Sequence, residues 1–170
     1  DYRDATIEVV GCDGAQWKLY DATKREIASG SKGLVEIGDI KLWSSEKPYL
    51  YTLIVKKGDD IRTRKVGFKE VKVSGNTILV NGRKIKFKGV NRHETNPDNG
   101  RTVSMDDMMA DILLFKKYNI NTVRTSHYPP VNEYLELADE YGLYIIDEAG
   151  VEAHATEYIS NIPDFIPMYQ

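Results

Sequence analysis

The sequence predicts a β-sandwich followed by the beginning of a parallel (β/α) barrel. In the first half of the 170 residues, short segments of alternating apolar and polar side chains are separated by turn residues, whereas the second half changes to helical periodicity. In addition, three extended segments of the second half each end in polar and ionisable residues. In a parallel barrel, such strand ends meet at one shared mouth.

The first half is expected to contain only strands. Alternation is clearest at Leu50, Thr52 and Ile54. Turn signals such as Asp13-Gly14 and Ser74-Gly75-Asn76 separate the extended segments. Because no helical pattern intervenes, these strands are expected to form an antiparallel sandwich. The expected strands span residues 5–10, 16–20, 33–42, 49–56 and 61–73.

A tight hairpin over residues 78–87 is expected between the two halves, because Asn81-Gly82 suits a type I′ turn. The expected domain boundary lies next to this hairpin. Residues 1–73 would form the sandwich, and residues 74–170 would form the linking hairpin and the start of the barrel.

The second half is expected to alternate strands and helices. Ser104 can cap a helix whose third residue is Asp107, and Gly142 can end a second helix. The order β-α-β-α-β with short connections requires parallel strands and right-handed crossovers. The expected elements are a strand at 86–90, a helix from 105, a strand at 120–125, a helix at 131–141 and a fully buried strand at 143–146.

Composition excludes several classes of function. A net charge of −3 with scattered Lys and Arg gives no electrostatic case for binding nucleic acid or an anionic membrane. No apolar run approaches the roughly 20 residues that span a bilayer. Cys12 is the only cysteine, so an internal disulfide is impossible and the cellular compartment stays open.

Candidate binding residues lie at the ends of two expected strands. His93 could hydrogen-bond a substrate hydroxyl or belong to a structural loop network. Arg124 is expected to point into the barrel interior, where it either orients carboxylates or forms a structural ion pair. His127 follows in the loop, where binding residues concentrate.

The third expected strand is followed by acidic residues and the last histidine. Asp147 and Glu148 come directly after the apolar run, and they are expected to pair or hydrogen-bond beneath a site. Glu152 and His154 are two residues apart, so in an extended segment both could hold one cation such as magnesium. A chance occurrence of this short pattern is the alternative.

Three motifs occur together at these strand ends: Gly89-Val90-Asn91-Arg92-His93-Glu94, Arg124-Thr125-Ser126-His127-Tyr128-Pro129 and Asp147-Glu148-Ala149. In combination they resemble family 2 of the glycoside hydrolases, and β-galactosidases most closely. The resemblance extends from Leu42-Trp43-Ser44-Ser45 to His154. It implies that the sandwich is immunoglobulin-like and that the second half is an incomplete (β/α)8 TIM barrel with about three of its eight strands.

The resemblance also implies roles for the candidate residues. His93 and His127 are similar to the sugar-contacting histidines of the family, and Arg124 to the arginine at the floor of the active site. Glu152 and His154 are similar to two ligands of the active-site magnesium in bacterial β-galactosidases. The related β-glucuronidases usually lack this Glu-x-His pair, so the resemblance favours hydrolysis of terminal β-D-galactosides.

Two positions depart from the family pattern, because Gly150 stands where an asparagine is common and Ala155 where a glycine is common. The family mechanism is retaining and uses two glutamates about 5 to 5.5 Å apart. The resemblance implies that both lie beyond Gln170. Glu133 is not one of them, because it is expected in the first turn of a helix.

A fragment of this kind is expected to be catalytically inactive alone and to self-associate through the edge of its unfinished barrel. Two alternatives remain: a fragment of a β-glucuronidase or another family 2 glycosidase, and a non-catalytic binding module.

Overall fold

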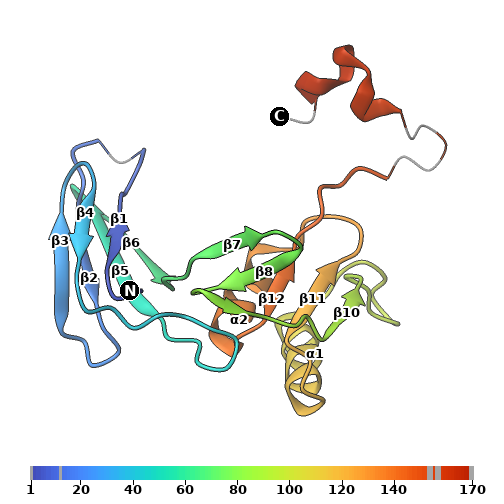
Figure 1. Ribbon diagram of the computed structural model, residues 1–170, viewed down its shortest axis with the longest axis horizontal. Coiled ribbons are helices and arrows are strands. Elements are labelled where there is room, and N and C mark those ends of the chain that lie inside the picture. Colours follow the sequence, from blue (N-terminus) through green and yellow to red (C-terminus); the bar gives the residue numbers. More distant parts are fainter. Residues whose placement is uncertain (1, 12, 153–154, 156–157, 169–170) are drawn as a thin grey trace.

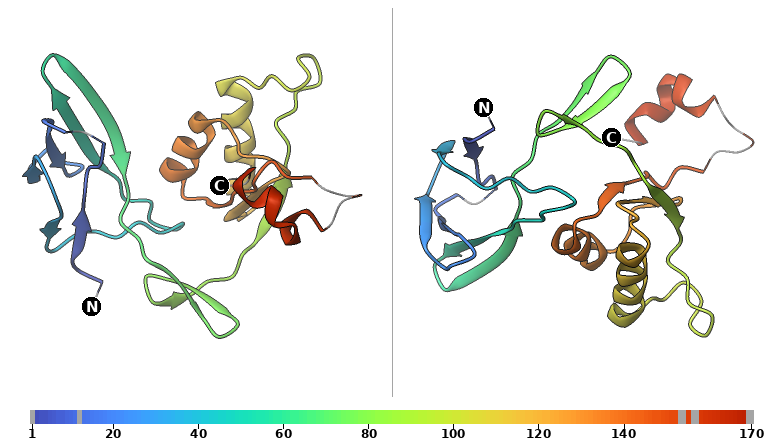
Figure 2. Two further views of the ribbon diagram at one scale, coloured as in Figure 1. Left: turned by 90° about the horizontal axis from the view of Figure 1, so that it is seen from above. Right: turned by 60° about the horizontal axis from the view of Figure 1, so that its bottom comes forward.

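The computed structural model of the chain describes residues 2–11, 13–152, 155 and 158–168. Figure 1 shows a strand-rich first half, a hairpin in the middle, and a second half in which helices accompany a parallel sheet. Seen from two further directions in Figure 2, the first and second halves lie side by side, and the hairpin that links them projects to one side of their junction.

The first half contains two antiparallel sheets. The larger sheet has the strand order β3-β2-β5-β6, and the smaller one pairs β1 with β4. The strands are β1 (Ala5–Ile7), β2 (Gln16–Tyr20), β3 (Glu26–Gly30), β4 (Val35–Ile37), β5 (Tyr51–Lys57) and β6 (Asp60–Val66).

A hydrophobic core forms between these two sheets. In β2, Trp17 and Leu19 are buried whereas Gln16 and Lys18 are exposed, because successive side chains of a strand point to opposite faces. Ile7 and Ile37 of the smaller sheet pack against this layer. The alternation in the sequence therefore predicted the antiparallel, two-layered architecture correctly.

Three expectations for the first half were wrong in detail. Strand β3 was not expected, because its residues Glu26, Ala28, Ser29 and Gly30 are poor strand formers; pairing with β2 overrides that preference. The expected strand at 33–42 is reduced to β4, since Asp39 has a positive φ of 57°. The expected strand at 61–73 is two strands.

The interruption after Val66 has a packing cause. A Cβ on Gly67 would lie 3.1 Å from the side chain of Trp43, and the Trp43 N–H donates to the carbonyl of Phe68 at 2.8 Å. Phe68 turns into the sandwich core. The chain then starts a new sheet with the order β7-β8-β9, whose strands are β7 (Val71–Ser74), β8 (Thr77–Val80) and β9 (Arg83–Lys84).

The hairpin between β8 and β9 has the expected turn. Asn81 and Gly82 have φ values of 50° and 72°, as a type I′ turn requires at both central positions. The Asn81 side chain donates from Nδ2 to the carbonyl of Trp43 at 3.0 Å and accepts at Oδ1 from the N–H of Glu70. The turn is therefore also tied to the sandwich.

The second half forms a parallel sheet in the order β10-β11-β12, as predicted. Helices α1 and α2 lie together on one side of this sheet (Figure 1). The core between helices and sheet contains Ile112, Val123 and Tyr134, each fully buried. The elements are β10 (Gly89–Arg92), α1 (Met105–Lys117), β11 (Thr122–Thr125), α2 (Asn132–Tyr141) and β12 (Tyr144–Ile146).

The ends of both helices follow the sequence signals. Ser104 and Asp107 form a reciprocal capping box at the start of α1, with the Asp107 N–H donating to Ser104 Oγ at 3.2 Å. Gly142 ends α2 in the left-handed conformation with φ of 73°. The expectation that 143–146 is fully buried was wrong, because Ile146 is 44% exposed at the edge strand β12.

The two halves contact each other through residues 43–45. Trp43 Nε1 donates to the carbonyl of Asp139 at 2.8 Å, and Ser45 Oγ donates to the carbonyl of Gly142 at 2.7 Å. A Cβ on Gly142 would lie only 2.3 Å from the Ser45 carbonyl oxygen. The end of α2 is therefore packed directly against the sandwich.

After β12 the chain leaves the sheet and forms two 3-10 turns, η1 (Ile159–Asn161) and η2 (Pro163–Met168). Apolar side chains of this segment are exposed, among them Phe165 and Ile166. Within the described residues, no helix combines the length and apolar character that a membrane span needs.

Candidate functional site

The parallel register brings three strand ends to the same edge of the sheet. Asn91 of β10 is opposite Arg124 of β11, which is in turn opposite Ile146 of β12. The residues that follow these positions therefore emerge side by side. They include His93 and His127.

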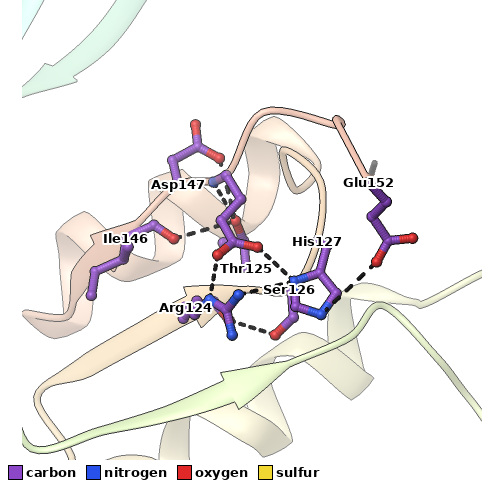
Figure 3. A network of polar contacts seen from close by, with 8 residues as sticks. Arg124, Thr125, Ser126, His127, Ile146, Asp147 and Glu152 are labelled. Atoms are coloured by element: carbon purple, nitrogen blue, oxygen red, sulfur yellow. Dashed lines mark hydrogen bonds and ion pairs between the residues drawn. The ribbon is translucent and has the colours of Figure 1, made fainter. Parts of the chain in front are cut away.

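Arg124 and His127 lie close together in this cluster (Figure 3), and both contact Glu148. Arg124 Nε donates to Glu148 Oε1, while His127 Nδ1 lies 2.7 Å from Glu148 Oε2. The peptide bond between Ser126 and His127 is cis. The side chains of Arg124 and His127 are 39% and 35% exposed, so a ligand can reach both from solvent.

Glu148 is held in its charged form. The hydrogen bond with His127, followed by that with Arg124, lowers the pKa of Glu148 below its ordinary value of 4.5. Both carboxylate oxygens are engaged, one with the guanidinium group and one with the imidazole. Glu148 therefore orients these two side chains and is unsuited to donate a proton.

A buried threonine ties the second and third strand ends together. Thr125, which is 4% exposed, accepts at Oγ1 from the N–H of Glu148 at 3.1 Å. The same oxygen lies 3.3 Å from Asp147 Oδ1 and 3.4 Å from the carbonyl of Ile146. Asp147 is exposed and reaches the cluster through Thr125. Sequence reasoning missed Thr125, although a polar residue at a strand position expected to be buried was an available signal.

His93 approaches the cluster from the end of β10. Its ring lies edge-on to that of His127, with 5.8 Å between the ring centroids and an angle of 81° between the planes. The structure therefore brings together His93, His127 and Arg124 from distant parts of the sequence. Glu148 contacts Arg124 and His127 from the third strand end.

Glu152 lies at the margin of the cluster. Its Oε1 is 3.9 Å from His127 Nε2, and its side chain is 55% exposed. His154, the other residue expected to bind a cation, lies outside the described residues. Among the residues that are described, no group of three or more His, Cys, Asp or Glu side chains converges on a common point.

The cluster is chemically suited to a polyhydroxylated ligand. A guanidinium group, two imidazoles and partly exposed carboxylates present donors and acceptors at one solvent-accessible edge. Glu133 is not part of this edge, because it lies in the first turn of α2, as predicted.

Sequence profiles of one family match both halves of the chain. The profile described as "Glycosyl hydrolases family 2" matches residues 2–69, and the one described as "Glycosyl hydrolases family 2, TIM barrel domain" matches residues 71–165.

Two curated relatives are each 50% identical to the chain. One is the "Beta-galactosidase" of Halalkalibacterium halodurans, with 82% of this chain and 15% of the relative covered. The other is the "Beta-galactosidase" of Streptococcus thermophilus, with 92% and 16% covered. The chain thus spans about 15% of the length of the curated relatives it matches.

Solved structures with a similar fold include the β-D-glucuronidase of Dictyoglomus thermophilum, with a TM-score of 0.77 and 30% identity over 87% of this chain and 29% of that one. The β-glucuronidase of Ruminococcus gnavus in complex with uronic isofagomine has a TM-score of 0.79 and 32% identity, covering 88% and 27% of the two chains. Since the barrel profile alone covers residues 71–165 of 170, the chain belongs to family 2 of the glycosyl hydrolases.

Proposed function

We propose that the chain is part of a retaining β-galactosidase that hydrolyses terminal β-D-galactosides. The observation that carries this proposal is the cluster of His93, Arg124 and His127 at the strand ends of a chain that is 50% identical to two β-galactosidases. In this proposal the two histidines contact the sugar, and Arg124 forms the floor of the site together with Glu148.

The proposal includes a finer description of the fold. Residues 1–73 would be an immunoglobulin-like sandwich, and residues 74–170 would be the linking hairpin and the first part of a (β/α)8 barrel. The two stacked antiparallel sheets support the first part, and the three parallel strands with their crossover helices support the second.

The acid/base and nucleophile glutamates are proposed to lie in other parts of a longer protein. A retaining mechanism needs two carboxyl groups about 5 to 5.5 Å apart with one of them free to donate a proton. Glu148 is engaged by Arg124 and His127, and Glu133 belongs to a helix turn. The 170-residue chain is therefore expected to be inactive alone.

Kinetics of the full-length protein test this proposal. The full-length protein should hydrolyse p-nitrophenyl β-D-galactoside, and His127→Ala should lower kcat/KM by roughly 100-fold, since a misplaced or missing contact in the site has an effect of that size. A matched control is Lys56→Ala, because Lys56 is exposed in the sandwich. The isolated chain should show no turnover.

A β-glucuronidase is the second candidate function, because the similar solved structures include β-glucuronidases. A comparison of p-nitrophenyl β-D-glucuronide with the galactoside decides between the two. A higher kcat/KM for the glucuronide would overturn the galactosidase proposal.

We also propose that Glu152 and His154 hold magnesium in the full-length protein. The exposed carboxylate of Glu152 suits a hard cation, which would add positive charge at the margin of the mouth. Because the described residues lack a group of three ligands, binding to the isolated chain should be weak. Calorimetry that finds tight binding to the isolated chain, lost in Glu152→Gln, would contradict this expectation.

The isolated chain is proposed to self-associate. Strand β12 is an edge strand, and a hollow of about 340 Å³ next to it is lined mainly by apolar side chains, including Ile78, Phe87 and Ile146. Sedimentation velocity should therefore show concentration-dependent dimers or larger species. A monodisperse monomer at high concentration would disprove the proposal.

A further inference from the structure

Glu94 connects the two loops that carry the histidines. It directly follows His93, and its side chain is only 13% exposed. Its main-chain N–H donates to the hydroxyl of Tyr128 at 2.9 Å, while its Oε1 accepts from the N–H of Val131 at 3.2 Å. Two hydrogen bonds from one residue therefore join the loop after β10 to the loop after β11.

The contact with Val131 completes half of a capping box that the local sequence lacks. Val131 is the N-cap residue of α2, and no side-chain cap hydrogen bond is formed there. In a capping box, a Glu at the third helical position accepts from the N–H of the N-cap residue, but Tyr134 occupies that position in α2. The Glu94 carboxylate from a distant loop accepts from this N–H instead, and its negative charge is favourable at a helix N-terminus.

The buried side chain of Arg92 holds the Glu94 carboxylate in place. The Arg92 side chain is 6% exposed, and its Nη1 lies 3.6 Å from Glu94 Oε1. Arg92 Nε donates to Asp111 of α1 at 2.8 Å, and the guanidinium carbon lies 4.1 Å from the centre of the Tyr134 ring. A charge this deeply buried must keep its partners. Arg92 is therefore a rigid base for the Glu94 carboxylate.

We propose that Glu94 is a positioning residue that holds the ring of His93 edge-on to His127. The carboxylate acts through its hydrogen bond to the start of α2, and the main-chain amide acts through Tyr128. These contacts alone carry the positioning of the His93 ring, whereas an effect of Glu94 on sugar binding rests on the proposed function.

Nuclear Overhauser effects between the imidazole protons of His93 and His127 test the geometry in the 170-residue chain. With 5.8 Å between ring centroids, a cross-peak is expected in the wild type at a dilution where the chain is monomeric. Glu94→Ala should abolish it. Glu94→Gln should restore it, because the amide oxygen can accept the same hydrogen bond from Val131.

Glu136→Ala is the matched control, because it removes an exposed carboxylate from α2 that does not belong to this connection. The cross-peak should remain in this variant. A cross-peak that persists in Glu94→Ala, or that disappears equally in Glu94→Gln or Glu136→Ala, would overturn the inference.

Hydrogen exchange provides a second test of the role of Glu94, and this measurement does not require a monomeric chain. The amide of Val131 should exchange at least tenfold faster in Glu94→Ala than in Glu94→Gln, and equal rates would count against the inference. In the full-length enzyme, Glu94→Ala should lower kcat/KM by roughly 10- to 100-fold, with rescue by Glu94→Gln. If no galactosidase activity exists but the cross-peak and exchange results hold, the proposed function fails and the positioning role stands.

Discussion

The sandwich and the barrel-like half of the chain bury their strands by different means. In the first half, two antiparallel sheets cover each other's apolar faces, and fully buried Leu19 lies between them. In the second half, helices cover one side of a parallel sheet around fully buried Ile112. Its edge strand leaves Ile146 44% exposed. The first half therefore buries its strands between two sheets, whereas the second leaves its edge strand β12 partly exposed.

Matched truncations of the two cores should produce the largest effects. Leu19→Ala and Ile112→Ala each remove a fully buried side chain, and each should lower the free energy of unfolding by about 2–5 kcal/mol. If the two cores are separate units, hydrogen exchange should accelerate only in the half that carries the substitution. Acceleration throughout the chain in both variants would show that the halves unfold together.

Gly142→Ala should weaken the contact between the halves. The new Cβ would meet the Ser45 carbonyl at 2.3 Å in a backbone conformation that disfavours side chains. The expected loss of stability in urea unfolding is roughly 2–4 kcal/mol. Gly100→Ala is the control, since Gly100 also has a positive φ of 65° but a Cβ added there would meet nothing within 4 Å. If Gly100→Ala lowers the free energy of unfolding as much as Gly142→Ala does, the loss comes from backbone strain and not from the contact with Ser45.

Ser104→Ala should cost about 1 kcal/mol, because it removes the side chain that caps α1. Ser104→Thr should retain most of that stability. Circular dichroism during urea unfolding measures both variants. If Ser104→Ala has no effect on the midpoint, the capping box contributes nothing to the second half.

Glu148→Gln should have the smallest effect on stability, and this effect should depend on pH. Because the folded-state pKa of Glu148 is lowered, its contribution to stability is present above the unfolded-state pKa and is lost as the pH falls through the folded value. The melting temperatures of the wild type and Glu148→Gln should therefore differ at pH 6 and converge as the pH falls below the ordinary pKa of 4.5 and through the lowered pKa of the folded state. If the difference in melting temperature stays constant over this pH range, the charged form of Glu148 does not stabilise the fold.

Local signals predicted the elements whose causes are local. The capping box at Ser104, the left-handed Gly142 and the turn at Asn81-Gly82 were all predicted from short stretches of sequence. Strand β3 was missed, since only its pairing with β2 makes it a strand. The expected strand at 61–73 was wrong because a contact with Trp43 turns the chain after Val66.

The sequence predicted which strand ends carry the candidate site, but it did not predict the hydrogen bonds that connect the residues of the site. The order of strands and helices predicted that His93, Arg124 and His127 would approach one another, and in the structure they do. The roles of Thr125 and Glu94 were missed, because each depends on a partner more than 20 residues away.

The sequence by itself determined which strands run parallel and which residue types follow their carboxyl ends, because alternation, capping and crossover length act over short distances. Only the tertiary structure decided which side chains each carboxylate contacts. Glu148 pairs with Arg124 and His127, whereas Glu94 accepts a hydrogen bond from the N–H of Val131 at the start of α2 and adjoins Arg92. Such pairings depend on strand register and on the packing of helices against the sheet, which no single segment encodes.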